Sequence, residues 1–303
     1  MIVYILGKMM GVEGLLLLIP ALVSLIYHEK SVISFLIVAA ILLAIYMVFG
    51  RKLPASKQIY GKEGFVIVGL AWILWSAFGA LPFVISGSIP HYIDALFETI
   101  SGFTTTGSTI LVDIEALPMG ISFWRSFTHW IGGMGVLVFV MMLTSLDDEN
   151  AMPLMRAEVP GPEADKLVPK ARHTARILYG MYFVLTAAEV VFLLFGGMNL
   201  YDALLHAFST AGTGGFSNRA ASVSFYDSAY IDGVITVFMI LFGVNFNVYF
   251  LLLTKKFSQA LKSEEVRCYF IVIIASALMI TFNVRHLFNN VWEALQQSFF
   301  QVG

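Results

Sequence analysis

The chain has 303 residues, of which 58% are hydrophobic and only 13% are charged, and its mean hydropathy is +0.82. A water-soluble protein of this length cannot bury so much apolar surface, because a large share of any folded chain stays at the surface. The composition therefore predicts an integral membrane protein with the lipid bilayer as its solvent. The single cysteine excludes an internal disulfide, and the scattered basic residues with a net charge of -2 give no basis for a nucleic-acid partner.

Several segments are long and apolar enough to cross the bilayer, which takes about 20 residues. The first two read as a helical hairpin rather than a signal peptide, since the second span follows the first almost at once. Glu13 interrupts the first span, and we expect it near a membrane surface. In chain order the predicted spans are 2–27, 31–50, 64–87, 118–145, 171–197, 229–254 and 266–284.

Lysine and arginine set the orientation, because they accumulate in cytoplasmic loops. With the N-terminus inside, 14 of the 18 basic residues fall on the cytoplasmic side, and four, including Arg125, fall on the outer side. The outer side then carries nine acids and a formal charge of -5, which would concentrate cations at a pore mouth. These acids are Glu29, Asp94, Glu98, Asp113, Glu115, Asp202, Asp227, Asp232 and Glu293.

Two outer segments are helical in pattern but only about half as long as a span. They are residues 92–103 and 201–211, and each runs into a Gly/Thr stretch, at 104–109 and 212–217. The order span, half-helix, Gly/Thr loop and span thus occurs twice. This is an internal repeat.

The repeat has a register that the sequence indicates. Asp94-Ala95-Leu96 matches Asp202-Ala203-Leu204, and this alignment pairs Thr105 with Thr213 and Gly107 with Gly215. A rival register pairs Gly107 with Gly214 but loses the Asp-Ala-Leu match, so we prefer the first.

The end of the chain predicts a third half-helix at 290–303. Ser298-Phe299-Phe300-Gln301 can be aligned with Ala95-Leu96-Phe97-Glu98. In this register the third Gly/Thr loop would begin a few residues beyond Gly303, so we expect the chain to be cut from a longer gene product.

A half-helix that feeds a Gly/Thr loop is typical of a cation-selective pore. Non-helical backbone at membrane depth is tolerated where it is buried or lines a water-filled path. There its carbonyl oxygens can replace the hydration shell of an ion. Glycine permits the required backbone dihedrals, and the C-terminal end of each half-helix adds partial negative charge.

Several motifs carry a resemblance to a known family. They are FETISGFTTTG at 97–107, FWR at 123–125 with WIGGMG at 130–135, PGP at 160–162, TGGFS at 213–217 and GVNF at 243–246. Together they resemble the membrane subunits of bacterial Trk-type potassium uptake systems, within the Trk/Ktr/HKT superfamily. The motifs follow the family order over nearly the whole chain.

This resemblance implies an all-α integral membrane fold, with repeated helix–half-helix pore loop–helix units around a pseudo-fourfold pore and an extra N-terminal helical hairpin. The domains expected are a hairpin at 1–57, a first repeat at 58–145, a cytoplasmic linker at 146–170, a second repeat at 171–258 and the start of a third repeat at 259–303.

The resemblance also implies a function and a site. The expected function is potassium uptake across the bacterial cytoplasmic membrane, with K+ as the transported ion, no cofactor and no enzymatic activity. The expected partners are the bilayer, a second copy of the chain and a cytosolic nucleotide-binding TrkA-like regulatory ring. The residues carried over as selectivity filter are Thr105, Thr106, Gly107, Thr213, Gly214 and Gly215.

Three questions stay open at this point. Glu98, with Asp113 and Glu115, is a candidate cation-attracting acid at the outer mouth, but a carboxylate inside a half-helix can equally brace the loop through nearby partners. The 146–170 linker is either a solvated connection or the contact for the cytosolic ring. Because two filter strands cannot enclose an ion, the alternative function is a non-conducting fragment or membrane interaction module.

Overall fold

The computed structural model describes residues 1–51, 61–135, 171–253, 255–288 and 290–303, and within these ranges it contains helices and no strand. The predicted 146–170 linker and the boundary at residue 57 lie outside the described residues. The longer helices are α1 (Ile2–Leu16), α2 (Leu18–Ile26), α3 (Val32–Ile45), α4 (Gly61–Gly79), α6 (Tyr92–Phe103), α7 (Met119–Gly133), α10 (Ala171–Phe195), α11 (Leu200–Ala211), α12 (Ala229–Gly243), α15 (Glu264–Val284) and α16 (Val291–Val302). Shorter helical segments are Tyr46–Gly50, α5 (Leu81–Ile85), Ser222–Tyr226, α13 (Phe246–Leu253), α14 (Phe257–Lys262) and Arg285–Leu287.

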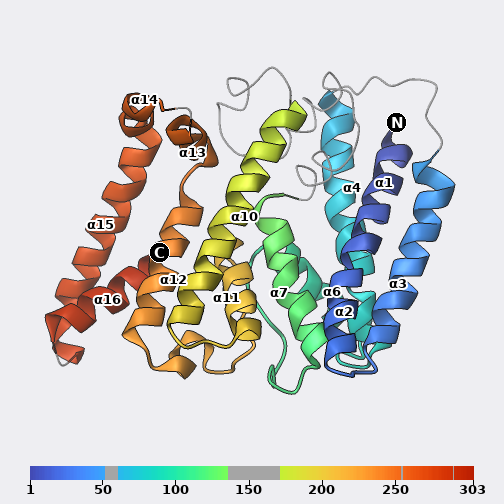
Figure 1. Ribbon diagram of the computed structural model, residues 1–303, viewed down its shortest axis with the longest axis horizontal. Coiled ribbons are helices and arrows are strands. Elements are labelled where there is room, and N and C mark those ends of the chain that lie inside the picture. The colour runs from blue at the N-terminus through green and yellow to red at the C-terminus, as the bar shows by residue number, and fades with distance from the viewer. Residues whose placement is uncertain (52–60, 136–170, 254, 289) are drawn as a thin grey trace.

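Five of the predicted spans are confirmed as helical stretches long and apolar enough to cross a bilayer: Ile2–Ile26, Val32–Gly50, Lys62–Ile85, Arg176–Phe195 and Glu264–Leu287. These helices stand side by side with roughly parallel axes (Figure 1). Many large apolar side chains point away from the protein, and only 17% of the most apolar stretch of α15 is buried. Such a surface is stable only in contact with lipid or with other apolar protein surface.

The prediction of one continuous span at 229–254 is wrong. Helix α12 ends at Gly243, the chain becomes extended at Val244, and α13 begins at Phe246. A side chain larger than hydrogen does not fit at position 243, because a Cβ on Gly243 would overlap the hydroxyl of Tyr269 on α15. Of the predicted span at 118–145, helix α7 covers residues up to Gly133, and residues from 136 onward lie outside the described part of the chain.

All three predicted half-helices are present as α6, α11 and α16, each with 12 residues. Helices α11 and α16 occupy only one half of the height of the bundle (Figure 1). The side chains of Asn199 and Asn290 cap α11 and α16 by accepting from the backbone amides of Asp202 and Glu293, which is the usual way to satisfy the first free amides of a helix.

The first repeat is packed around a buried aromatic cluster at the end of α6. Phe103 makes edge-to-face contacts with Trp75 and Trp124, at ring-centroid distances of 5.7 and 5.9 Å. The indole of Trp124 also donates to the carbonyl of Gly79, at 2.9 Å. These contacts fix the C-terminal end of α6, from which the first Gly/Thr loop departs, against α4 and α7.

Glu13 does not lie at a membrane surface, contrary to the expectation from sequence. Its side chain is 0% exposed and faces α4, with Oε1 about 3.3 Å from the position of a Cβ on Gly79. Glu13 lies in the middle of the crossing formed by α1 and α2, so its position along the helix keeps it away from both ends.

The N-terminal hairpin depends on close packing between α1 and the end of α3. A Cβ on Gly11 would lie 2.7 Å from Cγ of Tyr46, well inside van der Waals contact. Small residues of this kind let membrane helices approach each other closely.

We therefore expect Gly11→Ala to lower the free energy of unfolding by about 1–3 kcal/mol, as overpacking in a tight contact does. The measurement is SDS- or heat-induced unfolding of the purified protein in detergent micelles. Gly69→Ala on α4 is the matched control, because a Cβ there meets no atom within 4 Å. Equal stability of the two variants would contradict the packing argument.

Candidate functional site

The two Gly/Thr loops leave their half-helices with the same backbone hydrogen bonds. In the first, the amides of Thr104, Thr105 and Thr106 donate to the carbonyls of Ile100, Gly102 and Ser101, at 2.8, 3.0 and 2.9 Å. In the second, the amides of Gly212, Thr213 and Gly214 donate to those of Phe208, Thr210 and Ser209, at 3.1, 2.9 and 2.9 Å. Each bond in one loop has its counterpart in the other, in the register that the Asp-Ala-Leu match indicated.

The backbone dihedrals follow the same register. Thr105 and Thr213 have φ values of 55° and 54°, and Gly107 and Gly215 have φ values of 76° and 84°. A β-branched residue in the left-handed region costs free energy and persists only where the surrounding structure enforces it. The same strained conformation, held twice at equivalent positions, is the pattern that a functional loop shows.

The two loops are direct neighbours. A Cβ on Gly107 would overlap the carbonyl oxygen of Gly214, so the two backbones touch at this point. Gly214 in turn lies against the ring of His129 on α7, where a Cβ would overlap the imidazole. Of the six predicted filter positions, Gly107 of the first loop and Gly214 of the second are the two that meet directly.

Glu98 braces the first loop from behind. Its side chain is 0% exposed and forms an ion pair with Nε of Arg125 at 2.5 Å. The carboxylate also accepts from the hydroxyl of Thr109, at 2.9 and 3.0 Å, and from the amide of Ile110, at 3.1 Å. Every oxygen of Glu98 is thus occupied by the protein, and of the two interpretations left open by the sequence the geometry supports the brace.

Arg125 connects the first repeat to the second. The residue is 2% exposed, although its sequence position suggested the outer surface. Besides Glu98, its guanidinium donates to the carbonyl of Ser217, at 3.0 Å, and lies 3.6 Å from the ring centroid of Phe216. His129, one turn further along α7, stacks on the same ring at 4.0 Å. Arg125 and His129 on one face of α7 therefore contact the second loop. The ion pair between Arg125 and Glu98 links the same helix to the first half-helix.

The second repeat has a neutral counterpart of the Glu98 brace. His206 occupies the position of Glu98, and Ser217 that of Thr109. Nδ1 of His206 donates to the carbonyl of Asp202, at 2.8 Å, so Nε2 accepts from the hydroxyl of Ser217, at 3.2 Å. In both repeats that hydroxyl also accepts from the amide two residues later, of Leu111 and of Arg219.

The other two outer-mouth candidates lie on the exposed loop that follows the first Gly/Thr loop. Asp113 accepts from the amides of Glu115 and Ala116, both at 3.1 Å, and so shapes its own turn. Glu115 accepts from the amide of Ala220, at 3.1 Å, and so ties this loop to the one after the second Gly/Thr loop.

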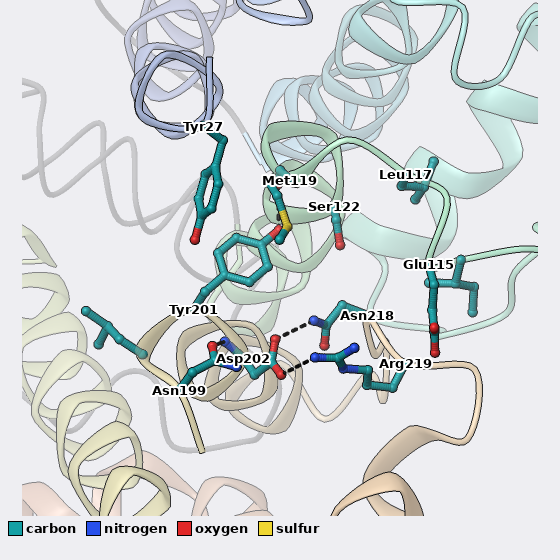
Figure 2. A pocket seen from close by; sticks show the side chains of 12 residues that line it. Tyr27, Glu115, Leu117, Met119, Ser122, Asn199, Tyr201, Asp202, Asn218 and Arg219 are labelled. Carbon is teal, nitrogen blue, oxygen red and sulfur yellow. Dashed lines mark hydrogen bonds and ion pairs between the residues drawn. The ribbon is translucent and has the colours of Figure 1, made fainter. Parts of the chain in front are cut away.

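A cavity of about 400 Å³ opens between these outer loops and the first turn of α11 (Figure 2). Asp202 lies at its wall and accepts from Asn218, Arg219 and Tyr226, at 2.6, 3.0 and 2.7 Å. Burial by itself would raise the pKa of Asp202, but the hydrogen bonds from Tyr226, Arg219 and Asn218 outweigh it, so the pKa lies below its ordinary value. Asp202 is therefore an ionised, fully partnered group.

A second cavity, of about 330 Å³, lies beside the second Gly/Thr loop. Thr213, Gly214 and Gly215 line one side of it, and Phe300 and Gln301 near the C-terminal end of α16 line another. The third half-helix thus ends next to the second loop, as expected if successive repeats surround a common axis.

Sequence reasoning missed Arg125, His129 and Phe216 as parts of the site. The available signal was a charged residue close to an apolar span, since such residues are rare and generally paired in membrane proteins. Pairing with Glu98 could not be deduced from spacing, because the two residues lie on different helices.

Comparison with known proteins gives consistent matches over nearly the whole chain. Residues 33–298 match a family model described as "TrkH: Cation transport protein". The chain is 35% identical over 294 residues to the Trk system potassium uptake protein TrkH of Escherichia coli K12, which covers 94% of this chain and 60% of that protein. It is 32% identical to the Trk system potassium uptake protein TrkG of the same organism, over 93% of this chain and 59% of TrkG.

The fold also matches a solved structure. The crystal structure of the potassium transporter TrkH from Vibrio parahaemolyticus superposes with a TM-score of 0.85 at 29% identity, covering 99% of this chain and 63% of that one. The chain therefore spans about 60% of the length of the relatives that it matches.

The buried ion pair predicts strong energetic coupling between Glu98 and Arg125. We expect Glu98→Gln or Arg125→Met alone to lower the free energy of unfolding by about 3–5 kcal/mol, because each leaves a buried charge without its partner. The double variant should lose much less unfolding free energy than the two single variants lose together. A double-mutant cycle in SDS unfolding measures this difference.

The partly exposed pair Arg219–Asp202, at 3.0 Å with the arginine side chain 29% exposed, is the matched control. Its coupling should stay below about 1 kcal/mol. Equal coupling in the two pairs would refute the structural role assigned to Arg125.

Proposed function

Because this chain belongs to the TrkH family of cation transport proteins, we propose that it contributes to a potassium uptake pathway in a bacterial cytoplasmic membrane, and that it acts in transport rather than as an enzyme. Its curated relatives are named for potassium uptake. The chain spans about 60% of their length, so the complete uptake activity is proposed for the protein that contains it.

The observation that carries the proposal is the pair of equivalent, touching loops at the ends of two half-helices. The filter strands proposed are Thr105–Gly107 and Thr213–Gly215. Their left-handed residues recur at equivalent positions, and Gly107 touches Gly214 of the neighbouring strand. In such a strand backbone carbonyls replace the water shell of a potassium ion, and the C-terminal ends of α6 and α11 favour a cation near the loops.

Exposed acids on the proposed outer side also support a pathway for cations. Asp113 and Glu115 are exposed on the loop after the first strand and are the outer-mouth acids that we retain, whereas Glu98 is assigned to bracing. Exposed acids near a pore mouth raise the local concentration of cations, and this effect weakens as salt is added.

The assembly proposed follows the family resemblance. We infer a homodimer, with a cytosolic nucleotide-binding TrkA-like ring as regulator. The 146–170 linker, proposed as a contact for that ring, lies outside the described residues.

The filter assignment is tested by cation uptake in a bacterial strain that lacks potassium transporters. Gly107→Ser and Gly215→Ser should each lower potassium uptake or its selectivity over sodium by about tenfold or more, since a side chain disfavours the positive φ that aims the carbonyls. Gly107→Ser should have the larger effect, because its side chain also overlaps the carbonyl of Gly214.

The control is Gly180→Ser on α10, where a Cβ meets no atom within 4 Å. Protein levels in the membrane are measured for each variant. Normal potassium uptake with sodium still excluded in both filter variants would rule out the assignment of these loops.

The orientation proposed places the N-terminus in the cytoplasm, because 14 of the 18 basic residues then lie inside. In a Cys268→Ser background, a cysteine at Ser88 should react with a membrane-impermeant maleimide added to intact cells. A cysteine at Ser56 should react only after the cells are opened. Equal labelling from outside would reverse or abolish this topology.

A further inference from the structure

The outer turn of the N-terminal hairpin makes a contact that spans a long stretch of sequence. Glu29, between α2 and α3, accepts hydrogen bonds from the backbone amides of Met119 and Gly120, at 2.6 and 3.0 Å. These are the first two residues of α7, the helix that carries Arg125 and His129.

Helix α7 needs this partner because it has no cap of its own. Its N-cap residue is Pro118, whose side chain makes no capping hydrogen bond. The first amides of a helix lack intrahelical acceptors, and an acidic group there also interacts favourably with the helix dipole. Glu29 supplies both the acceptor and the negative charge from another part of the chain.

Neighbouring contacts hold Glu29 and the start of α7 in one position. The hydroxyl of Ser31 lies within hydrogen-bond distance of the carboxylate of Glu29, at 3.1 Å, and of the hydroxyl of Ser24, at 2.9 Å. Gly120 lies so close to α2 that a Cβ would overlap the hydroxyl of Ser24. From the second repeat, the hydroxyl of Tyr201 donates to the carbonyl of Met119, at 2.6 Å.

The hairpin and the second half-helix thus meet at the first residue of α7. Figure 2 shows Tyr27 of the hairpin and Tyr201 of α11 beside Met119, and the two tyrosine rings are in edge-to-face contact at 5.7 Å. Less than two turns later, Arg125 on the same helix binds Glu98 and the carbonyl of Ser217. A shift or rotation of α7 at its start would be transmitted to both loops, since a helix is stiff over so short a distance.

We propose that Glu29 is a positioning residue for the selectivity filter: by capping α7 from the hairpin, it fixes the angle at which Arg125 and His129 meet the two loops. This inference rests on the proposed function. It gives the N-terminal hairpin a role in ion selectivity in addition to its role as a membrane anchor.

A competing explanation is that Glu29 only adds negative charge at the outer face and attracts cations. That effect would be shared by other outer acids and would be screened by salt. Asp227 provides the matched comparison, because it is exposed on the outer side and Asp227→Asn removes one charge isosterically, as Glu29→Gln does.

The experiment measures rubidium and sodium uptake by the protein expressed from its complete gene, in cells without other potassium transporters, normalised to protein in the membrane. We expect Glu29→Gln to raise the ratio of sodium to rubidium uptake by about twofold to fivefold, the range that corresponds to losing one charged helix-terminus contact. Tyr201→Phe, which leaves the charge unchanged, should shift the ratio in the same direction. Both shifts should persist when choline chloride is added, and Asp227→Asn should leave the ratio unchanged.

Three outcomes would count against the proposal. Unchanged ratios in both variants, with normal uptake by the wild type, would mean that the hairpin does not position the filter. A shift that Asp227→Asn shares and that salt removes would assign the effect to surface charge. If Glu29→Gln fails to reach the membrane, an unchanged ratio in Tyr201→Phe overturns the proposal by itself. Absence of uptake by the wild type would instead refute the proposed function.

Discussion

One buried guanidinium, that of Arg125, joins the parts of this protein that would otherwise be separate. Removing an arginine from water is costly unless charge and hydrogen-bonding capacity are both matched. Arg125 has three partners on two segments: Glu98 in the first half-helix, and the ring of Phe216 and the carbonyl of Ser217 at the end of the second Gly/Thr loop. Any relative displacement of the two repeats would leave a buried charge without a partner. The arrangement of the loops is therefore fixed by the cost of breaking this set as much as by apolar packing.

The two repeats reach the same loop geometry with different chemistry. In the first, the carboxylate of Glu98 accepts from the hydroxyl of Thr109 and is paired with Arg125. In the second, the neutral pair His206 and Ser217 occupies the same positions and requires no counter-ion. The backbone conformation is retained because the left-handed threonine and glycine positions define the loop, whereas any pair that satisfies its hydrogen bonds can brace it. Backbone symmetry in this protein is accordingly closer than side-chain symmetry.

Several acids on the predicted outer side are engaged by the protein, so fewer of them are free than the formal charge suggests. Glu98 is neutralised by Arg125, and Asp202 by Arg219. Glu29 is engaged by two helix amides and Glu115 by the amide of Ala220. Acids in this region act first as acceptors for backbone groups that loops near a membrane leave unsatisfied. We propose attraction of cations only for acids that stay exposed, such as Asp113 and Glu115.

The sequence by itself determined the membrane class, five of the crossings, the three half-helices and the register of the two loops, because hydropathy, segment length and a repeated motif are local properties of the chain. The half-helices α6 and α11 lie within one residue of their predicted bounds. Tertiary structure alone decided which polar groups meet. Arg125 looked like an outer-surface residue and Glu13 like an interfacial one, yet both are buried, since their partners or neighbours come from other helices. The break between α12 and α13, the brace at Glu98 and the cap that Glu29 places on α7 likewise depend on contacts between distant segments, and no pattern along the chain encodes such distances.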